Sequence, residues 1–235
     1  MDEPAGTIAT RVRAVLDEIH RAAARAGRAP DAIRLVAVSK TVSVERLREA
    51  VDAGIRHIGE NRLQEALPKI EALGRDGVIW HFIGTLQRRK VKSVVGRCET
   101  IHSVDSLPLA EEIARRAQEI GLRQRILLEV NLGGEVSKGG FEPAAMLAAL
   151  PALNDLPSLD IRGLMTLPPP TSLAEEARPY FRRLRELAHA LTGQGYGNIN
   201  MEELSMGMSH DYQVAVEEGA TYVRVGTAIF GARHD

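Results

Sequence analysis

The chain has 235 residues, a hydrophobic fraction of 44%, a charged fraction of 26% and a formal net charge of −1 at pH 7. These values are typical of a globular protein and give no sign of a nucleic-acid-binding or membrane-binding surface. No apolar run approaches the roughly 18 residues of a membrane span, and the acidic start shows no signal peptide. Cys98 is the sole cysteine, so an intrachain disulfide is excluded and a reducing, cytoplasmic location is expected.

The predicted elements begin with an amphipathic helix over residues 7–26, which Gly27 ends. Strands and helices then alternate along the chain. Short apolar strands are predicted at residues 35–38, 56–59, 79–84, 100–104, 125–131, 160–166, 203–206 and 222–225. Helices are predicted between and after them at residues 43–53, 61–73, 87–95, 106–120, 142–152, 172–192 and 209–218.

Several of these strands lack polar alternation, which is typical of a parallel sheet covered by helices. Eight such strands alternating with helices predict an α/β fold, a single (β/α)₈ TIM-like barrel domain over residues 1–235 with an extra N-terminal helix. A doubly wound open sheet is the alternative. It calls for a glycine-rich turn after the first strand, and Ser39-Lys40-Thr41 contains no glycine.

Lys40 follows the first predicted strand, at the end of the barrel where active sites lie. The chain has only five lysines against 25 arginines, so a lysine at this position is unusual. A desolvated lysine can lose its proton and form a Schiff base with a carbonyl, which arginine cannot do. The alternative is a lysine whose ammonium group simply reaches solvent.

Two turns near the end of the sequence are predicted to bind phosphate. Met206-Gly207-Met208-Ser209 follows the seventh strand, and Gly226-Thr227 follows the eighth, the two places where barrels often hold phosphate. Glycine lets backbone N–H groups approach an anion, and the hydroxyls add donors. Alternatively, Ser209 is only a helix cap and the glycines only make turns.

A lysine amine and a phosphate cradle on one face suggest pyridoxal 5′-phosphate (PLP) as the cofactor. The aldehyde of PLP needs a lysine, and its pyridine nitrogen needs a partner. Arg224 on the eighth strand is a candidate partner, since a charged guanidinium disfavours protonation of the ring nitrogen and weakens carbanion chemistry. A strand-end salt bridge is the alternative role for Arg224.

Six stretches of the chain together resemble the PLP homeostasis protein family, whose barrel is similar to the N-terminal domain of alanine racemase. They span nearly the whole chain in the family's order and spacing. The stretches are Leu35-Val36-Ala37-Val38-Ser39-Lys40-Thr41, Gly59-Glu60-Asn61, His81-Phe82-Ile83-Gly84, Arg162-Gly163-Leu164-Met165, Leu204-Ser205-Met206-Gly207-Met208-Ser209 and Val223-Arg224-Val225-Gly226-Thr227-Ala228-Ile229-Phe230-Gly231.

The resemblance implies Lys40 as the Schiff-base lysine and Arg224 as the partner of the pyridine nitrogen. It further implies phosphate binding by Ser205, Gly226 and Thr227, with Gly207, Met208 and Ser209 beside them, and a ring pocket lined by Asn61, His81 and Met165. The chain departs from the family pattern at Val42-Ser43, Arg62 and His210. Arg62 puts the electrostatics of the pocket rim in doubt. No metal site is predicted.

Two of the candidate residues have simpler readings. A histidine on an apolar strand, such as His81, is more often a satisfied core residue than an acid or base. Lys138 lies in the glycine-rich loop of residues 133–140, where a second amine could pass PLP on, although a solvated loop lysine is the simpler reading.

Three functions are compatible with these residues: a PLP carrier or regulator without turnover, a PLP-dependent amino-acid racemase, and a Schiff-base aldolase acting without PLP. Racemisation needs a base on each face of the ring, and only Lys40 is evident. The chain also ends at Asp235, without the second domain of alanine racemase. We therefore expect a monomeric, non-enzymatic protein of PLP homeostasis that delivers the cofactor to apo PLP-dependent enzymes.

Overall fold

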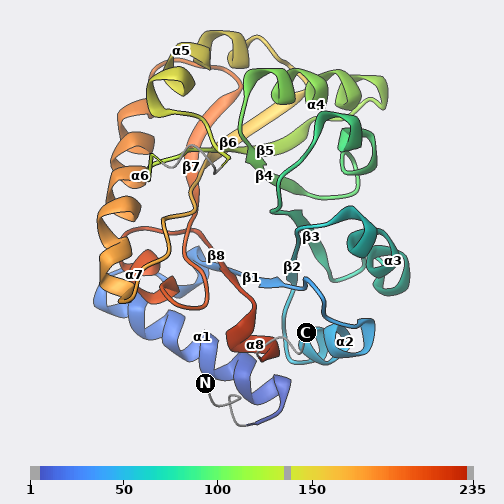
Figure 1. Cartoon of the computed structure of the whole chain (residues 1–235), viewed down its shortest axis with the longest axis vertical. Coiled ribbons are helices and arrows are strands. Elements are labelled where there is room, and N and C mark those ends of the chain that lie inside the picture. Colours follow the sequence, from blue (N-terminus) through green and yellow to red (C-terminus); the bar gives the residue numbers. More distant parts are fainter. Residues whose placement is uncertain (1–5, 135–138, 232–235) are drawn as a thin grey trace.

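Short β-branched runs form eight parallel strands that close into a barrel, each strand pairing with the next and β8 with β1. The structure, a computed structural model, describes residues 6–134 and 139–231. The strands are β1 (Arg34–Val38), β2 (His57–Glu60), β3 (Ile79–Phe82), β4 (Thr100–Val104), β5 (Gln124–Glu129), β6 (Leu159–Met165), β7 (Ile199–Ser205) and β8 (Tyr222–Val225). The predicted (β/α)₈ barrel with an N-terminal helix is confirmed (Figure 1).

Helices connect the strands and cover the barrel on the outside (Figure 1). The α-helices are α1 (Ile8–Arg25), α2 (Val44–Asp52), α3 (Leu63–Leu73), α4 (Leu107–Glu119), α5 (Pro143–Asn154), α6 (Arg178–Leu191), α7 (Tyr212–Glu217) and α8 (Thr227–Phe230). Three 3₁₀ helices add η1 (Pro30–Ala32), η2 (Arg88–Ser93) and η3 (Ala174–Ala177). Among the helices of the described ranges, none is long and apolar enough to cross a membrane.

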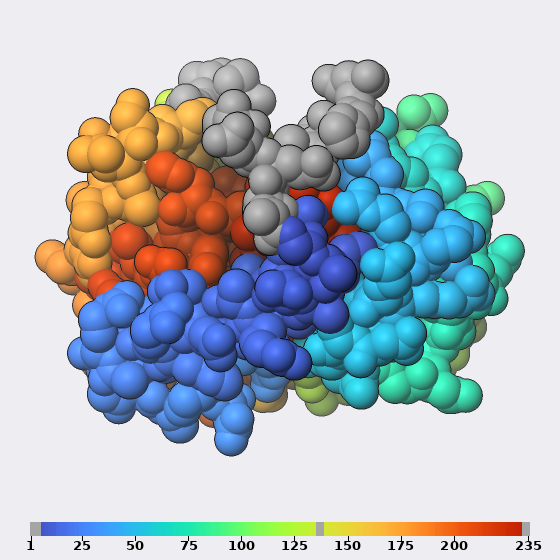
Figure 2. Space-filling view, turned by 90° about the horizontal axis from the view of Figure 1, so that it is seen from below, coloured from blue at the N-terminus to red at the C-terminus, as the bar shows by residue number. Residues whose placement is uncertain are grey.

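The N-terminal helix α1 packs against α2, α7 and α8, so it joins the first and last units of the barrel. Figure 2 shows this blue segment at the surface, between the cyan segments and the red ones near the end of the chain. The Thr7 hydroxyl caps it by accepting a hydrogen bond from the Thr10 N–H at 3.3 Å. Its inner face buries six apolar side chains: Ile8, Val12, Val15, Ile19, Ala22 and Ala23. These positions recur at helical spacing, which is why the sequence predicted the helix correctly.

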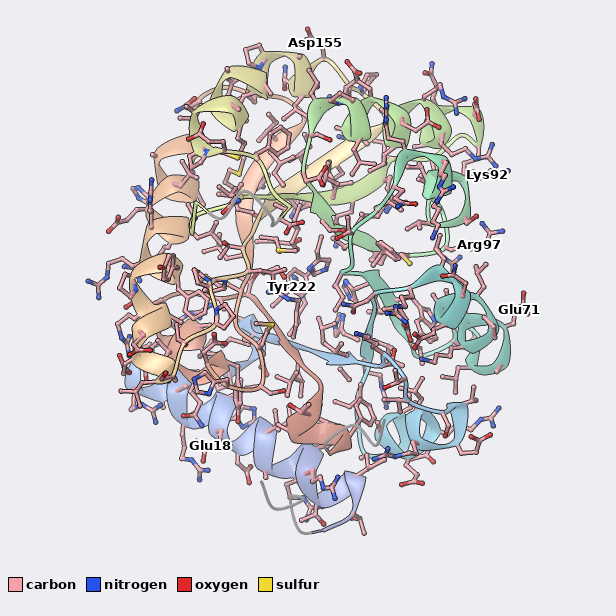
Figure 3. All side chains as sticks on the ribbon, in the orientation of Figure 1. Glu18, Glu71, Lys92, Arg97, Asp155 and Tyr222 are labelled. Atoms are coloured by element: carbon pink, nitrogen blue, oxygen red, sulfur yellow. The ribbon has the colours of Figure 1, made fainter. Side chains whose placement is uncertain are left out.

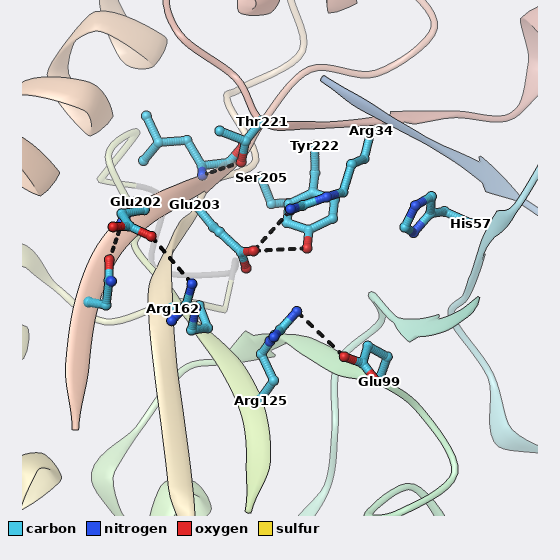
Figure 4. Close-up of polar contacts among 12 residues, drawn as sticks. Arg34, His57, Glu99, Arg125, Arg162, Glu202, Glu203, Ser205, Thr221 and Tyr222 are labelled. Carbon is cyan, nitrogen blue, oxygen red and sulfur yellow. Dashed lines mark hydrogen bonds and ion pairs between the residues drawn. The ribbon is translucent and has the colours of Figure 1, made fainter. Parts of the chain in front are cut away.

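The interior of the barrel is separate from the main apolar core between strands and helices. Val36, Leu127, Met165 and Tyr222 form a small buried cluster of their own. Figure 3 shows Tyr222 in the middle of the ring of strands. At the amino end of the barrel, the carboxylate of Glu203 accepts hydrogen bonds from Arg34 at 2.9 Å and from the Tyr222 hydroxyl at 3.2 Å (Figure 4). The barrel therefore holds polar groups as well as apolar ones.

Candidate functional site

A pocket of about 640 Å³ opens at the carboxyl ends of the strands, which is a suitable volume for a small-molecule ligand. Seven of the eleven site residues that the sequence predicted line it: Lys40, Asn61, Met208, Ser209, Arg224, Gly226 and Thr227. They come from the segments after β1, β2, β7 and β8 and from β8 itself, so residues far apart in the sequence meet at one mouth.

Lys40 is half-buried and follows β1 in a tightly held turn. Thr41, the next residue, has a φ of +64°, which is uncommon for a β-branched side chain. Its backbone N–H donates to Glu65 at 2.6 Å, and on the other side the Ser39 carbonyl accepts from Lys69 at 2.6 Å. Both neighbours of Lys40 are therefore fixed, and the amine projects from a defined backbone position.

Arg224 on β8 is 3% exposed and lines the floor of the pocket. Its Nη1 donates to the Ser205 hydroxyl at 2.5 Å and its Nη2 donates to the Thr166 carbonyl at 3.0 Å. Burial lowers the pKa of Arg224 to about 10, so the guanidinium remains charged at neutral pH. A fixed positive charge with further N–H donors is thus available to a ligand.

The loops after β7 and β8 touch through Ser209. Its hydroxyl accepts hydrogen bonds from the backbone N–H groups of Gly226 at 3.1 Å and Ala228 at 3.4 Å. Gly207 has a φ of +90°, and a Cβ there would lie 2.5 Å from the Cβ of Ala215. Gly207 therefore allows the turn to pack on α7, but it does not line the pocket.

Three further predicted residues lie inside the barrel and do not line the pocket. His81 is 1% exposed, Met165 belongs to the inner apolar cluster, and Ser205 is fully buried. The Ser205 hydroxyl contacts Arg224 and, at 2.8 Å, the Nδ1 of His102. Ser205 therefore supports Arg224 from inside the barrel.

The pocket also has lining residues outside the predicted set: Arg46, which the sequence did not single out, and His210, which was noted only as a departure from the family pattern. Arg46 lies in the first turn of α2, the helix that follows Lys40, and donates to the Phe230 carbonyl. Its place in the first turn of the helix that follows Lys40 is a sequence signal that could have found it. No Asp or Glu occurs among the described lining residues, so the pocket is positively charged and suits an anion.

Asn61 lines the pocket and carries an unsatisfied polar atom. Its Oδ1 is buried and has no hydrogen-bond partner among the residues that the structure describes. A buried acceptor without a partner is costly, so a donor on a bound molecule would stabilise it. Within the ranges that the structure describes, no group of three or more His, Cys, Asp or Glu side chains could hold a metal ion. Lys138 lies outside the described residues.

Comparison with known proteins places the chain in a family. The profile of the alanine racemase N-terminal domain family matches residues 12–234. The pyridoxal phosphate homeostasis protein of Aquifex aeolicus is 48% identical over 95% of this chain and 97% of its own. The protein of the same name from Pseudomonas aeruginosa is 43% identical over 97% of this chain and 96% of its own.

Solved structures at 39–41% identity also match the chain over nearly its full length. An unknown protein from Bifidobacterium adolescentis superposes with a TM-score of 0.90 at 39% identity, covering 95% of this chain and 94% of that one. PipY of Synechococcus elongatus, solved with PLP bound, gives 0.80 at 41% identity, covering 91% of this chain and 100% of that one. Alanine racemase of Streptomyces lavendulae, at 18% identity and a TM-score of 0.69, shares the fold. The chain therefore belongs to the pyridoxal phosphate homeostasis protein family, whose barrel is that of the alanine racemase N-terminal domain.

Proposed function

We propose that this protein binds PLP in the pocket at the carboxyl end of the barrel and acts in PLP homeostasis. The observation that carries the proposal is that Lys40 and Arg224 line one cavity whose described lining contains no acidic residue. PLP is an anion whose aldehyde reacts with an amine, so this cavity suits both of its ends. The PLP-bound structure of PipY, a relative at 41% identity, supports the proposal.

The residues divide by the part of the cofactor they would hold. Lys40 would form the Schiff base, and Arg224 would donate a hydrogen bond to the pyridine nitrogen. The backbone and hydroxyls of Ser209, Gly226 and Thr227, which lie together after β7 and β8, would hold the phosphate. Two further lining residues would contact the ligand. The unpartnered oxygen of Asn61 would accept a hydrogen bond from a donor on the ligand, and Met208 would contact the ligand from the loop after β7.

Bound PLP supplies an electrophilic carbon and an electron-withdrawing ring. Arg224 limits the second property, because a permanent donor keeps the pyridine nitrogen unprotonated and the ring a weak electron sink. We therefore propose that the protein holds and releases PLP without turnover of amino acids, and that apo PLP-dependent enzymes receive it. The relatives' names, which refer to homeostasis, support this role.

An amino-acid racemase remains the second candidate, because His210 lines the pocket and could act as a base beside Lys40. The test is to incubate the PLP-loaded protein with L-alanine and measure D-alanine. A carrier produces none above the rate of free PLP, and His210→Ala changes nothing. Production that depends on both Lys40 and His210 would establish the enzyme instead.

Delivery is tested by mixing the loaded protein with an apo PLP-dependent enzyme in the presence of a scavenger of free PLP. Direct transfer activates the enzyme faster than the measured release of PLP into the scavenger allows. Activation no faster than that release would limit the protein to storing and buffering the cofactor.

A further inference from the structure

A chain of hydrogen bonds crosses the inside of the barrel from its amino end to Arg224. The Nδ1 of His57 lies 2.9 Å from the Nε2 of His81, whose Nδ1 lies 3.0 Å from the Nε2 of His102. The Nδ1 of His102 lies 2.8 Å from the Ser205 hydroxyl, which accepts from Arg224 at 2.5 Å. Consecutive strands β2, β3 and β4 each supply one histidine, and β7 and β8 supply the upper two residues.

The three histidines surround the ring of Tyr222 and sit in the dry interior. The ring centroids of His81 and His102 lie 5.5 and 5.1 Å from that of Tyr222. His81 is 1% exposed and His102 is fully buried, whereas His57, at the start of β2, is half-buried. Figure 4 shows His57 on the side of the Tyr222 ring away from Glu203. Beyond His57, the chain of hydrogen bonds is therefore buried away from solvent.

The partners fix the direction of every hydrogen bond in the chain. Arginine has no acceptor, so the Ser205 oxygen must accept from Arg224. In the described part of the chain the Ser205 hydroxyl has one further partner, the Nδ1 of His102, and satisfying its own proton requires that Nδ1 to accept. The neutral imidazole of His102 then carries its proton on Nε2 and donates it to the Nδ1 of His81. By the same reasoning, His81 donates from its Nε2 to the Nδ1 of His57.

The surroundings of the three histidines favour the neutral form that this pattern requires. Burial lowers the pKa of His102 and of His81 well below the ordinary value, and each is further lowered by a neighbouring histidine. Burial, with Arg34, lowers the pKa of His57 to about 4. An imidazolium at His102 would donate from Nδ1 and turn the Ser205 proton toward Arg224, which would break the contact to the guanidinium.

We propose that His102, acting through Ser205, is a positioning residue for Arg224. The inference rests on the proposed PLP binding for its functional meaning. With Ser205 held as an acceptor, two edges of the guanidinium are engaged by Ser205 and the Thr166 carbonyl, and the remaining N–H groups are left for the pocket. His81 and His57 in turn fix the tautomer of His102. Residues at the amino end of the barrel therefore influence how Arg224 donates to the ring nitrogen of the cofactor.

The first arm of the test uses the apo protein. Ring ¹⁵N NMR of the full chain, with resonances assigned by single His→Gln variants, reports which nitrogen of each imidazole is protonated. The proposal predicts the Nε2–H form for His57, His81 and His102. A proton on Nδ1 of His102 would overturn it, whether or not the protein binds PLP.

The second arm uses PLP labelled with ¹⁵N in the ring. Ser205→Ala and His102→Leu should each weaken PLP binding about tenfold and raise the pH at which the bound ring nitrogen takes up a proton. His102→Gln, whose amide offers both an acceptor and a donor, should restore the wild-type values. His189→Leu, which removes an exposed histidine, is the matched control.

The outcomes separate the two proposals. If the wild-type protein takes up no PLP, the proposed function fails, and the tautomers of the three histidines alone test whether the chain of hydrogen bonds has the proposed direction. If wild-type protein binds PLP but a folded Ser205→Ala variant keeps the ring-nitrogen titration unchanged, the positioning role is wrong. A Ser205→Ala variant that weakens binding with unaltered titration and unaltered His102 resonances would contradict it too, and would return Ser205 to phosphate binding.

Discussion

The backbone of Asn61 lies against Gly84 so closely that no side chain fits between them. A Cβ at Gly84 would lie 2.2 Å from the Asn61 carbonyl oxygen and 2.6 Å from its Cα. Gly84 follows β3 and Asn61 follows β2, so the glycine lets two neighbouring strand ends converge at the pocket. The position of the unpartnered Asn61 Oδ1 therefore depends on a residue that does not line the pocket itself.

Gly84→Ala should displace Asn61 and weaken PLP binding, because backbone atoms under 3 Å from a new Cβ must move. We expect at least a tenfold loss of affinity and a destabilisation of about 1–3 kcal/mol. Gly197→Ala is the matched control, since nothing lies within 4 Å of a Cβ there. Isothermal titration with PLP decides it, and equal affinities for the two variants would contradict this account of Gly84.

Lys69→Met should destabilise the protein by about 3–5 kcal/mol, because it leaves the Glu60 carboxyl buried without its cation. Lys69 donates to Glu60 at 2.7 Å, and the two side chains are 8% and 1% exposed. Burial raises the pKa of Glu60 and the hydrogen bond from Lys69 opposes that rise, so the variant should raise it further. Urea unfolding measures the loss.

The double variant Glu60→Gln with Lys69→Met serves as the control, since it removes the buried charge as well. It should recover more than half of the stability lost in Lys69→Met. A single variant within 1 kcal/mol of wild type would show that the pair contributes little to the turn that holds Lys40.

Glu129 should make stability depend on pH. Burial and the neighbouring Asp105 raise the pKa of Glu129 to about 7, from an ordinary value of 4.5. The folded protein then holds a proton that the unfolded chain has lost, so the free energy of unfolding falls as pH rises from 4.5 to about 7. The shift corresponds to at most about 3 kcal/mol.

Glu129→Gln removes this titration, so the variant should gain stability relative to wild type as pH increases and level off above neutrality. Taking the difference between the two proteins at each pH cancels the opposite contribution of the histidines, whose lowered pKa values destabilise the fold in acid. A difference that stays constant across the range would rule out a raised pKa at Glu129.

Arg46→Ala should weaken PLP binding about tenfold and reduce its salt dependence, because it removes a cation from the pocket lining. Arg48→Ala is the matched control: Arg48 lies on the same helix, is exposed and donates to the Ala72 carbonyl outside the pocket. Titrations at low and high salt compare them. The same loss in both variants would assign the effect to the helix as a whole.

The fold could be predicted because each strand is a short apolar run bounded by polar turns. The boundaries were less accurate where polar residues sit inside a strand: β7 begins at Ile199 and includes Asn200 and Glu202, whereas the predicted strand begins at Glu203. Residues 88–93 form a 3₁₀ helix, because hydrogen bonds such as Lys90 N–H to the Gln87 carbonyl, at 2.8 Å, reach back only three residues.

The sequence predicted which strand ends carry the site, but it did not predict which of their side chains contact one another. Lys40 and Arg224 could be placed on the same face because carboxyl ends of parallel strands meet there. Ser205, at the end of β7, was expected at the phosphate but lies under Arg224. The histidine chain could not be predicted at all, because His81 and His102 meet only through the register of neighbouring strands, which no local pattern specifies.

The most direct test of the central proposal is borohydride reduction of the purified protein incubated with PLP, followed by peptide mapping. We predict a visible absorption band that reduction abolishes, with the cofactor recovered on Lys40, and no band or adduct in a folded Lys40→Ala variant. Adduct at another lysine would move the Schiff base elsewhere, and a protein that takes up no PLP would contradict the proposed function.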